Sequence, residues 1–180
     1  FDLWVQKWRS QPGRGDAVVV RYADDFVMGF EHRSDAENFL SDLRERFAKF
    51  GLELHPDKTR LLEFGRFAAT NRQRRGERRP ETFDFLGLTH RCGRTRKGGY
   101  TIARETARKK MAAKLREVKA ELRRRMHTPI PDQGKYLKSV IGGHVRYYGV
   151  PGNGNRINAF RLIIGQQWQR SLSRRSQKGE

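Results

Sequence analysis

Two short runs of strand-forming residues, 17–20 and 26–30, lie only four residues apart, and this spacing constrains the fold more than any other feature of the sequence. Their valine and phenylalanine side chains favour β-strands. A link this short can join two strands only as an antiparallel hairpin. The link reads Tyr22-Ala23-Asp24-Asp25. The sequence therefore predicts a hairpin that carries two adjacent carboxylates at its tip.

Helical periodicity and other short apolar runs predict the rest of the first 102 residues. Apolar spacing at i, i+3, i+4 and i+7 indicates helices over 1–8 and 36–50. Ser34 and Glu37 form a capping-box pattern at the start of the second helix, and Gly51 is placed to cap its end. An arginine-rich loop and further short strands are expected, the loop over 66–81 and the strands over 52–54, 59–64, 83–88 (with a glycine break) and 100–102.

The period becomes helical near residue 103 and stays helical to the end of the chain. A long helix is predicted by one apolar stripe, which consists of Met111, Leu115, Val118, Leu122 and Met126. Two more helices are expected over about 132–148 and 156–173. The predicted fold class is therefore α+β, with a mixed part over residues 1–102 and an all-helical part over 103–180.

Positive charge is concentrated in the later part of the chain. Residues 1–65 hold 10 Lys/Arg and 12 Asp/Glu, whereas residues 66–180 hold 29 Lys/Arg and 8 Asp/Glu. This asymmetry points to a polyanionic partner, most commonly nucleic acid. A membrane partner is disfavoured because the charge spreads over a long loop and several helices, and no apolar run is long enough for a membrane span.

The acidic tip of the hairpin predicts a metal site. Adjacent carboxylates repel each other unless a cation compensates them. Mg²⁺ takes oxygen ligands, usually one or two carboxylates together with substrate phosphates. Such sites serve phosphoryl transfer, in which two ions stabilise the attacking and leaving oxygens. A solvated acidic turn is the simpler alternative for a bare Asp-Asp pair. Cys92 is the only cysteine, which excludes a zinc site built from cysteine pairs.

The sequence around the hairpin resembles the Tyr-x-Asp-Asp block of reverse transcriptases, in the form found in bacterial group II intron (maturase) proteins. The first block is Val19-Val20-Arg21-Tyr22-Ala23-Asp24-Asp25-Phe26-Val27. Three further blocks follow in the family's order, at 51–59, 83–87 and 143–153. The resemblance implies that residues 1–102 form part of a polymerase palm and that residues 103–180 form the helical thumb, or X region.

The resemblance also implies roles for individual residues. Asp24 and Asp25 would bind two Mg²⁺ ions, with Mn²⁺ as an alternative, and Tyr22 and Ala23 would lie beside the primer end and the incoming nucleotide. Lys58 would approach the nucleotide phosphates and act as a general acid, although an ordinary surface lysine is an equal alternative. The primer strand would be held by Phe85, Leu86 and Gly87, which could also be core and bulge residues.

One departure from the family pattern concerns the third metal ligand. Family members carry another carboxylate on an earlier palm strand, and nothing in residues 1–21 matches that block, because Asp2 and Asp16 lie in a different context. We therefore expect the chain to represent the later part of a reverse transcriptase domain. By itself it is expected not to polymerise.

The long basic helix is the predicted nucleic-acid surface. Residues 104–125 contain ten Lys/Arg and three Glu, and phosphate contacts by such cations give affinity that does not depend on base sequence. The candidate contacts are Arg104, Arg108, Lys109, Lys114, Arg116, Lys119 and Arg123. The arginine-rich loop is expected either to bind RNA or to be disordered.

The sequence supports one leading function and two alternatives. The leading function is that of an RNA-directed DNA polymerase of a group II intron or similar mobile element, a nucleotidyltransferase that uses an RNA template, a DNA primer and dNTPs in the bacterial cytoplasm. The first alternative is a non-catalytic maturase that binds intron RNA and assists splicing. A nucleotide cyclase is disfavoured because it would not require a basic thumb.

Overall fold

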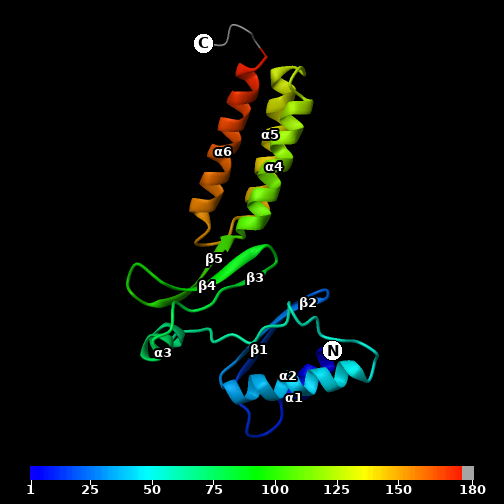
Figure 1. The fold of residues 1–180 in the computed structure, drawn as a ribbon, viewed down its shortest axis with the longest axis vertical. Helices are drawn as coiled ribbons and strands as arrows, with labels where there is room; N and C mark the ends of the chain where they lie inside the picture. Colours follow the sequence, from blue (N-terminus) through cyan, green and yellow to red (C-terminus); the bar gives the residue numbers. More distant parts are fainter. Residues whose placement is uncertain (176–180) are drawn as a thin grey trace. The chain divides into compact units, whose positions relative to one another are not determined.

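The computed structural model describes residues 1–175 and has an α+β fold, as predicted. The chain forms two compact units, Phe1–Glu63 and a second unit that begins at Phe64. The predicted division near residue 103 therefore falls inside the second unit, where the last strand is followed by a bundle of helices (Figure 1).

The first unit is a two-stranded hairpin covered on one side by two helices (Figure 1). It comprises α1 (Asp2–Arg9), β1 (Ala17–Tyr22), β2 (Asp25–Phe30) and α2 (Arg33–Ala48). Its core consists of Val5, Trp8, Phe39 and Leu43, all at most 3% exposed, and the strands add Val19, Met28 and Phe30. The predicted helix over 1–8 and the predicted hairpin are confirmed.

Only one face of the hairpin is buried. Val19 packs against the helices, while its neighbours Val18 and Val20 are 62% and 50% exposed. Because successive side chains of a strand point to opposite faces, the prediction of a buried strand is correct for one face and wrong for the other.

The sequence predicted the end of α2 correctly but not its start. The predicted capping box is wrong, because the N-cap residue is His32, no side chain caps the helix, and Glu37 instead pairs with Arg33. The predicted cap at Gly51 is confirmed. Its φ of +67° suits glycine, and the next N–H, that of Leu52, bonds back to the Phe47 carbonyl.

The strands predicted over 52–54 and 59–64 are wrong, since these residues are irregular. The apolar residues of these segments do not belong to a strand, and their environments differ. Leu54 packs on the core of the first unit, whereas Leu52 and Leu61 are 56% and 44% exposed. A strand requires a partner edge for its backbone groups, and these segments pair with none in the described part of the chain.

The second unit begins with a short helix and a three-stranded sheet. The elements are α3 (Ala68–Arg74), β3 (Phe83–Phe85), β4 (Leu88–Arg94) and β5 (Tyr100–Thr106), with the strands antiparallel in the order β3-β4-β5. The prediction of a loop over 66–81 is wrong for residues 68–74. The predicted strand over 83–88 is two strands joined at Leu86-Gly87.

Three long helices complete the second unit and lie side by side in Figure 1. They are α4 (Arg108–Arg124), α5 (Ile130–Tyr148) and α6 (Gly154–Ser173). Their shared core contains Met111, Val118, Leu122, Leu137, Phe160 and Ile164. The prediction that helix begins near 103 is wrong, because pairing of Leu88 with Thr106 keeps residues 103–106 in β5.

A buried asparagine joins the sheet to the helices. Asn153 is fully buried; its side-chain oxygen accepts the Thr106 N–H, and its amide donates to the Thr106 hydroxyl and to the Tyr148 carbonyl, each at 2.8 Å. Buried polar groups are stable only when their hydrogen bonds are made. The end of β5 is therefore fixed to the segment between α5 and α6.

Candidate active site

The acidic turn is tighter than the sequence suggested. Tyr22 and Asp25 face each other as the last pair of the hairpin, so only Ala23 and Asp24 form the turn. Ala23 has a φ of +54°, a conformation that costs a residue other than glycine about 1–2 kcal/mol. Strain of this kind is concentrated at functional sites. The turn is thus a candidate site on its backbone geometry as well as on its carboxylates.

An arginine that the sequence analysis did not single out supports the turn. Arg21 donates to the Ala23 carbonyl at 2.9 Å and forms a two-point ion pair with Asp2 at 2.9 and 2.6 Å. Asp2 therefore neutralises the cation nearest the turn. The position of Arg21 directly beside the motif could have indicated this role. Its partner Asp2 lies 19 residues away in the sequence, so the pair itself was not predictable.

The two turn carboxylates are open to a ligand. Asp24 and Asp25 are both exposed, and neither forms a hydrogen bond or ion pair with a described residue. Asp25 shares the hairpin face of Tyr22 and Val20, opposite the helices. Within residues 1–175, no cluster of three or more His, Cys, Asp or Glu could hold a metal ion. The turn can therefore supply two oxygen-donor groups and no more.

Lys58 lies in the same unit, on a turn that follows the irregular segment. Its backbone N–H bonds to the His55 carbonyl at 3.2 Å, and the Thr59 N–H bonds to the same carbonyl at 2.9 Å. His55 thus acts through its backbone as a turn residue. The Lys58 side chain is exposed and forms no ion pair with either turn carboxylate.

The predicted primer-grip residues form a second tight turn, and this one is anchored. Leu86 and Gly87 both have positive φ, +50° and +73°, as two-residue hairpin turns require. The Leu86 carbonyl accepts the Tyr147 hydroxyl at 3.2 Å, and the Gly87 carbonyl accepts the Ala107 N–H at 2.9 Å. A Cβ at residue 87 would lie 2.7 Å from the Tyr148 hydroxyl. A side chain at residue 87 would therefore be strained by its φ and would displace the Tyr148 hydroxyl.

Three stripes of residues, spaced three or four apart, run along α4 and differ in charge. The core stripe is Met111, Leu115, Val118 and Leu122. A mixed stripe contains both cations and glutamates, and ion pairs join Lys114 to Glu117 and Arg124 to Glu121. Its members are Lys110, Lys114, Glu117, Glu121 and Arg124. The third stripe, which we call the basic stripe, is exposed and has no acidic member; it consists of Lys109, Ala112, Arg116, Lys119 and Arg123.

The stripes separate the predicted nucleic-acid contacts into three groups. The basic stripe holds Lys109, Arg116, Lys119 and Arg123, and Arg108 lies on the same side. Lys114 belongs to the mixed stripe, where its ammonium pairs with Glu117 at 2.7 Å. Arg104 is not on the helix, because it belongs to β5.

Arg104 instead lines an open pocket of about 460 Å³ with His90, Thr101 and Ile102. His90 stacks on Phe83 with nearly parallel rings, 4.8 Å between centroids. Burial, assisted by the neighbouring Arg104 charge, lowers the pKa of His90 below its ordinary value. An imidazole beside a single guanidinium does not form a catalytic set, and none of the residues of the first hairpin belongs to this unit.

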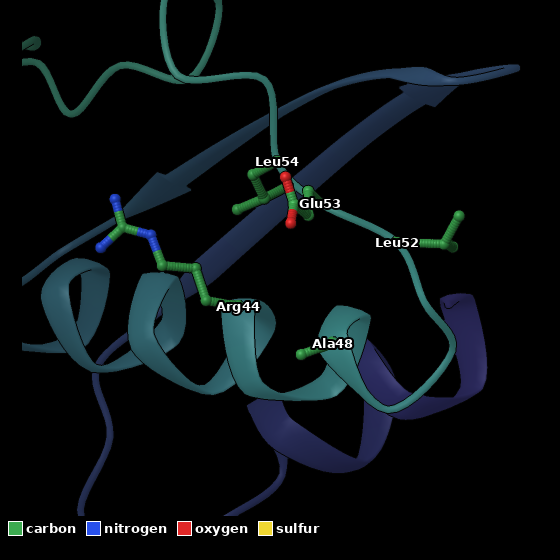
Figure 2. A pocket seen from close by; sticks show the side chains of 5 residues that line it. All are labelled: Arg44, Ala48, Leu52, Glu53 and Leu54. Atoms are coloured by element: carbon green, nitrogen blue, oxygen red, sulfur yellow. The ribbon is translucent and has the colours of Figure 1, made fainter.

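A second pocket, of about 230 Å³, lies over the later half of α2 (Figure 2). Arg44 and Ala48 reach it from the helix, while residues 52–54 cross above it. None of the predicted catalytic residues lines it. The acidic turn lies instead at the exposed tip of the hairpin.

No helix among the described residues is long and apolar enough to cross a membrane.

Comparison with known proteins identifies one family. The family described as "Reverse transcriptase (RNA-dependent DNA polymerase)" matches residues 2–90. No match is found among curated proteins or solved structures. The matched range contains the acidic turn, Lys58 and the Leu86-Gly87 turn. Residues 2–90 of this chain are thus similar to the reverse transcriptase family.

Proposed function

We propose that the chain forms the later palm and the thumb of an RNA-directed DNA polymerase of the bacterial group II intron type. One observation carries the proposal: Asp24 and Asp25 are exposed and unpaired on a strained hairpin turn. The family match over residues 2–90 supports the same chemistry.

Asp24 and Asp25 fit Mg²⁺, or Mn²⁺, as oxygen donors. Mg²⁺ commonly takes only one or two protein carboxylates and completes its shell with substrate phosphates and water. When bound, two such ions stabilise the attacking and leaving oxygens of a phosphoryl transfer. The carboxylates hold the cations at the tip of the hairpin, and the anchored Arg21 keeps the turn in place.

The other predicted residues position the substrates. Tyr22 and Ala23 lie beside the primer end and the dNTP, and Lys58 neutralises the nucleotide phosphates and donates a proton to the leaving pyrophosphate. The turn of Phe85, Leu86 and Gly87 holds the primer strand. The basic stripe extends over about 21 Å of helix and binds the RNA template and the DNA primer through their phosphates.

Primer extension on an RNA template with Mg²⁺, measured with the complete protein, tests this function. Asp24→Asn keeps the shape of the side chain and removes its charge. We expect it to reduce extension by at least about a thousandfold, equivalent to roughly 4 kcal/mol of transition-state stabilisation, while RNA affinity stays the same. Glu31→Gln, on the same hairpin, is the control. Normal extension by Asp24→Asn would exclude the metal assignment.

The alternative is a maturase that binds intron RNA in the cytoplasm without polymerising. The charge of α4 favours it, since the basic stripe requires no metal site. Both functions predict RNA binding, and only the polymerase predicts loss of a reaction in Asp24→Asn. A protein that binds RNA tightly and never extends a primer would therefore be a maturase.

A further inference from the structure

The arginine-rich segment 66–81 has a defined structure, and we call it the arginine knob. It contains the helix α3 and a turn that closes back on it, where the Glu77 N–H bonds to the Arg72 carbonyl at 2.9 Å and Gly76 has a φ of +69°. Ala68, 3% exposed, is its buried side chain. The knob is thus folded and presents defined faces.

The glutamates of the knob form ion pairs with arginines of the knob itself. Arg72, only 19% exposed, forms ion pairs with Glu77 at 3.3 Å and Glu81 at 3.9 Å and donates to the Arg78 carbonyl at 3.1 Å. Arg75 also pairs with Glu77. Two arginines and two glutamates therefore hold the fold together, and the remaining arginines are not compensated by these acids.

The outer face of the knob combines cations with an exposed aromatic ring. Phe67, Thr70 and Arg74 lie three and four residues apart and so share one face of the helical turn. Phe67 is 68% exposed. Three more exposed arginines, Arg66, Arg78 and Arg79, add to the same exposed charge.

The knob is attached to the sheet of the second unit at its base. The Gly65 N–H bonds to the Cys92 sulfur at 3.4 Å, and Phe64 packs edge-on against Phe83 with 5.1 Å between ring centroids. Residues 83–85 then pair in the sheet. Both ends of the knob are consequently fixed, which lowers the entropy that binding would otherwise cost.

We propose that the arginine knob is a second nucleic-acid binding surface, separate from the basic stripe of α4. Arg74, Arg78 and Arg79 bind backbone phosphates, and a base stacks on Phe67. All six basic residues of 66–79 are arginine and none is lysine, and the planar guanidinium suits phosphate oxygens and base faces better than an ammonium does. An acidic protein partner would explain the charge but not the exposed ring.

This inference rests on the proposed function only for the class of ligand. A binding assay tests it without any measurement of polymerisation. Replacing Arg74, Arg78 and Arg79 by alanine in the full chain leaves the internal ion pairs intact. Affinity for a labelled single-stranded 20-mer is measured by fluorescence anisotropy across a salt series, with RNA and DNA of one sequence. We expect at least a tenfold loss of affinity and a salt slope lower by about two, since each phosphate contact contributes about 0.7.

The control variant loses the same amount of charge in the first unit. In it, the exposed residues Arg9, Arg44 and Lys49 are replaced by alanine. It should leave the salt slope unchanged. Equal losses in the two triple variants, or an unchanged slope in the knob variant, would overturn the proposal. Loss with both RNA and DNA assigns the contact to phosphates, and loss with RNA alone assigns part of it to the ribose hydroxyl.

Phe67→Ala tests the stacking contact and the class of partner. We expect about a tenfold loss of affinity, because stacking of one base on an aromatic ring has about this effect, with the salt slope unchanged. Polyglutamate of matched length should compete poorly; equal competition would overturn the proposal in favour of an acidic protein. Knob-dependent binding without primer extension would reject only the proposed function, and extension with unchanged binding in the knob variant would reject only this inference.

Discussion

The two units of this chain divide two kinds of charge between them. The first 65 residues are close to neutral and expose two unpaired carboxylates on a strained turn, whereas residues 66–180 hold 29 of the 39 Lys/Arg. Unpaired carboxylates and guanidiniums on one surface would neutralise each other, as Asp2 and Arg21 do at 2.6 Å. In the sequence, the two exposed carboxylates and most of the cations therefore belong to different units.

The two hairpin turns, at residues 23–24 and 86–87, differ in how firmly other residues hold them. Both contain a residue other than glycine with positive φ, Ala23 in one and Leu86 in the other. The first turn leaves its side chains open, while the second is held by Tyr147 and Ala107. The proposed metal site requires an accessible turn, and the proposed primer grip would benefit from a turn that is fixed in advance.

The largest expected effect would test whether the two units are stable independently. Phe160→Ala removes a fully buried ring from the helical core, and such truncations cost about 3–5 kcal/mol. We expect the second unit to lose that stability, followed by circular dichroism. In a Trp168→Phe background, where only Trp4 and Trp8 fluoresce, tryptophan fluorescence should report an unchanged first unit. Leu162→Ala, exposed on the same helix, is the control. A joint unfolding transition would contradict independence.

A smaller effect would sharpen the distinction between the stripes of α4. Replacing Arg116, Lys119 and Arg123 by alanine removes uncompensated cations, and we expect affinity for RNA to fall about 10- to 100-fold with a lower salt slope. Replacing Lys110, Lys114 and Arg124 removes the same charge from the mixed stripe and should reduce affinity less. Equal losses in a salt titration would show that position on the helix does not matter.

The anchored turn can be tested with a pair of glycines. Gly87→Ala places a Cβ 2.7 Å from the Tyr148 hydroxyl at a φ of +73°, and we expect a destabilisation of about 1–3 kcal/mol. Gly142→Ala, in open space within α5, should instead stabilise the helix by up to about 1 kcal/mol. Thermal or urea unfolding measures both. Equal signs for the two variants would contradict the described turn.

The smallest expected effect is a loss of stability of the second unit at acidic pH. His144 is buried, stacks on Phe160 at 3.7 Å, and its Nε2 has no partner among the described residues. Burial, and secondarily the Lys114 charge, lowers the pKa of His144 in the folded state. The unfolded chain therefore binds the proton more readily, and stability should fall as the pH decreases below about 6.5.

Urea unfolding of the second unit at pH 7.5 and pH 5.5 measures this effect. His144→Gln removes the titrating group and should flatten the pH dependence, whereas His127→Gln, at an exposed position, should preserve it. The same loss of stability with acid in wild type and His144→Gln would assign the effect to other groups.

Much of the fold was predictable because its signals are local. The apolar runs beside Tyr22-Ala23-Asp24-Asp25 define the hairpin, and the periodicity of α4, α5 and α6 defines the bundle. The errors occur where distant contacts decide the local structure. Residues 103–106 continue β5 because they pair with β4, and the segment after α3 folds back so that Glu77 and Glu81 pair with Arg72. No periodicity within these segments carries that information.

The sequence by itself determined the acidic tip, the amphipathic helices, the concentration of positive charge after residue 65 and the similarity to reverse transcriptases. The tertiary structure decided which charges are available. It pairs Arg21 with Asp2, Lys114 with Glu117 and Arg72 with two glutamates, and leaves the basic stripe and the outer arginines of the knob exposed. The physical reason is that a charge is available for binding only when no opposite charge lies near it in space, and spatial proximity depends on the whole fold.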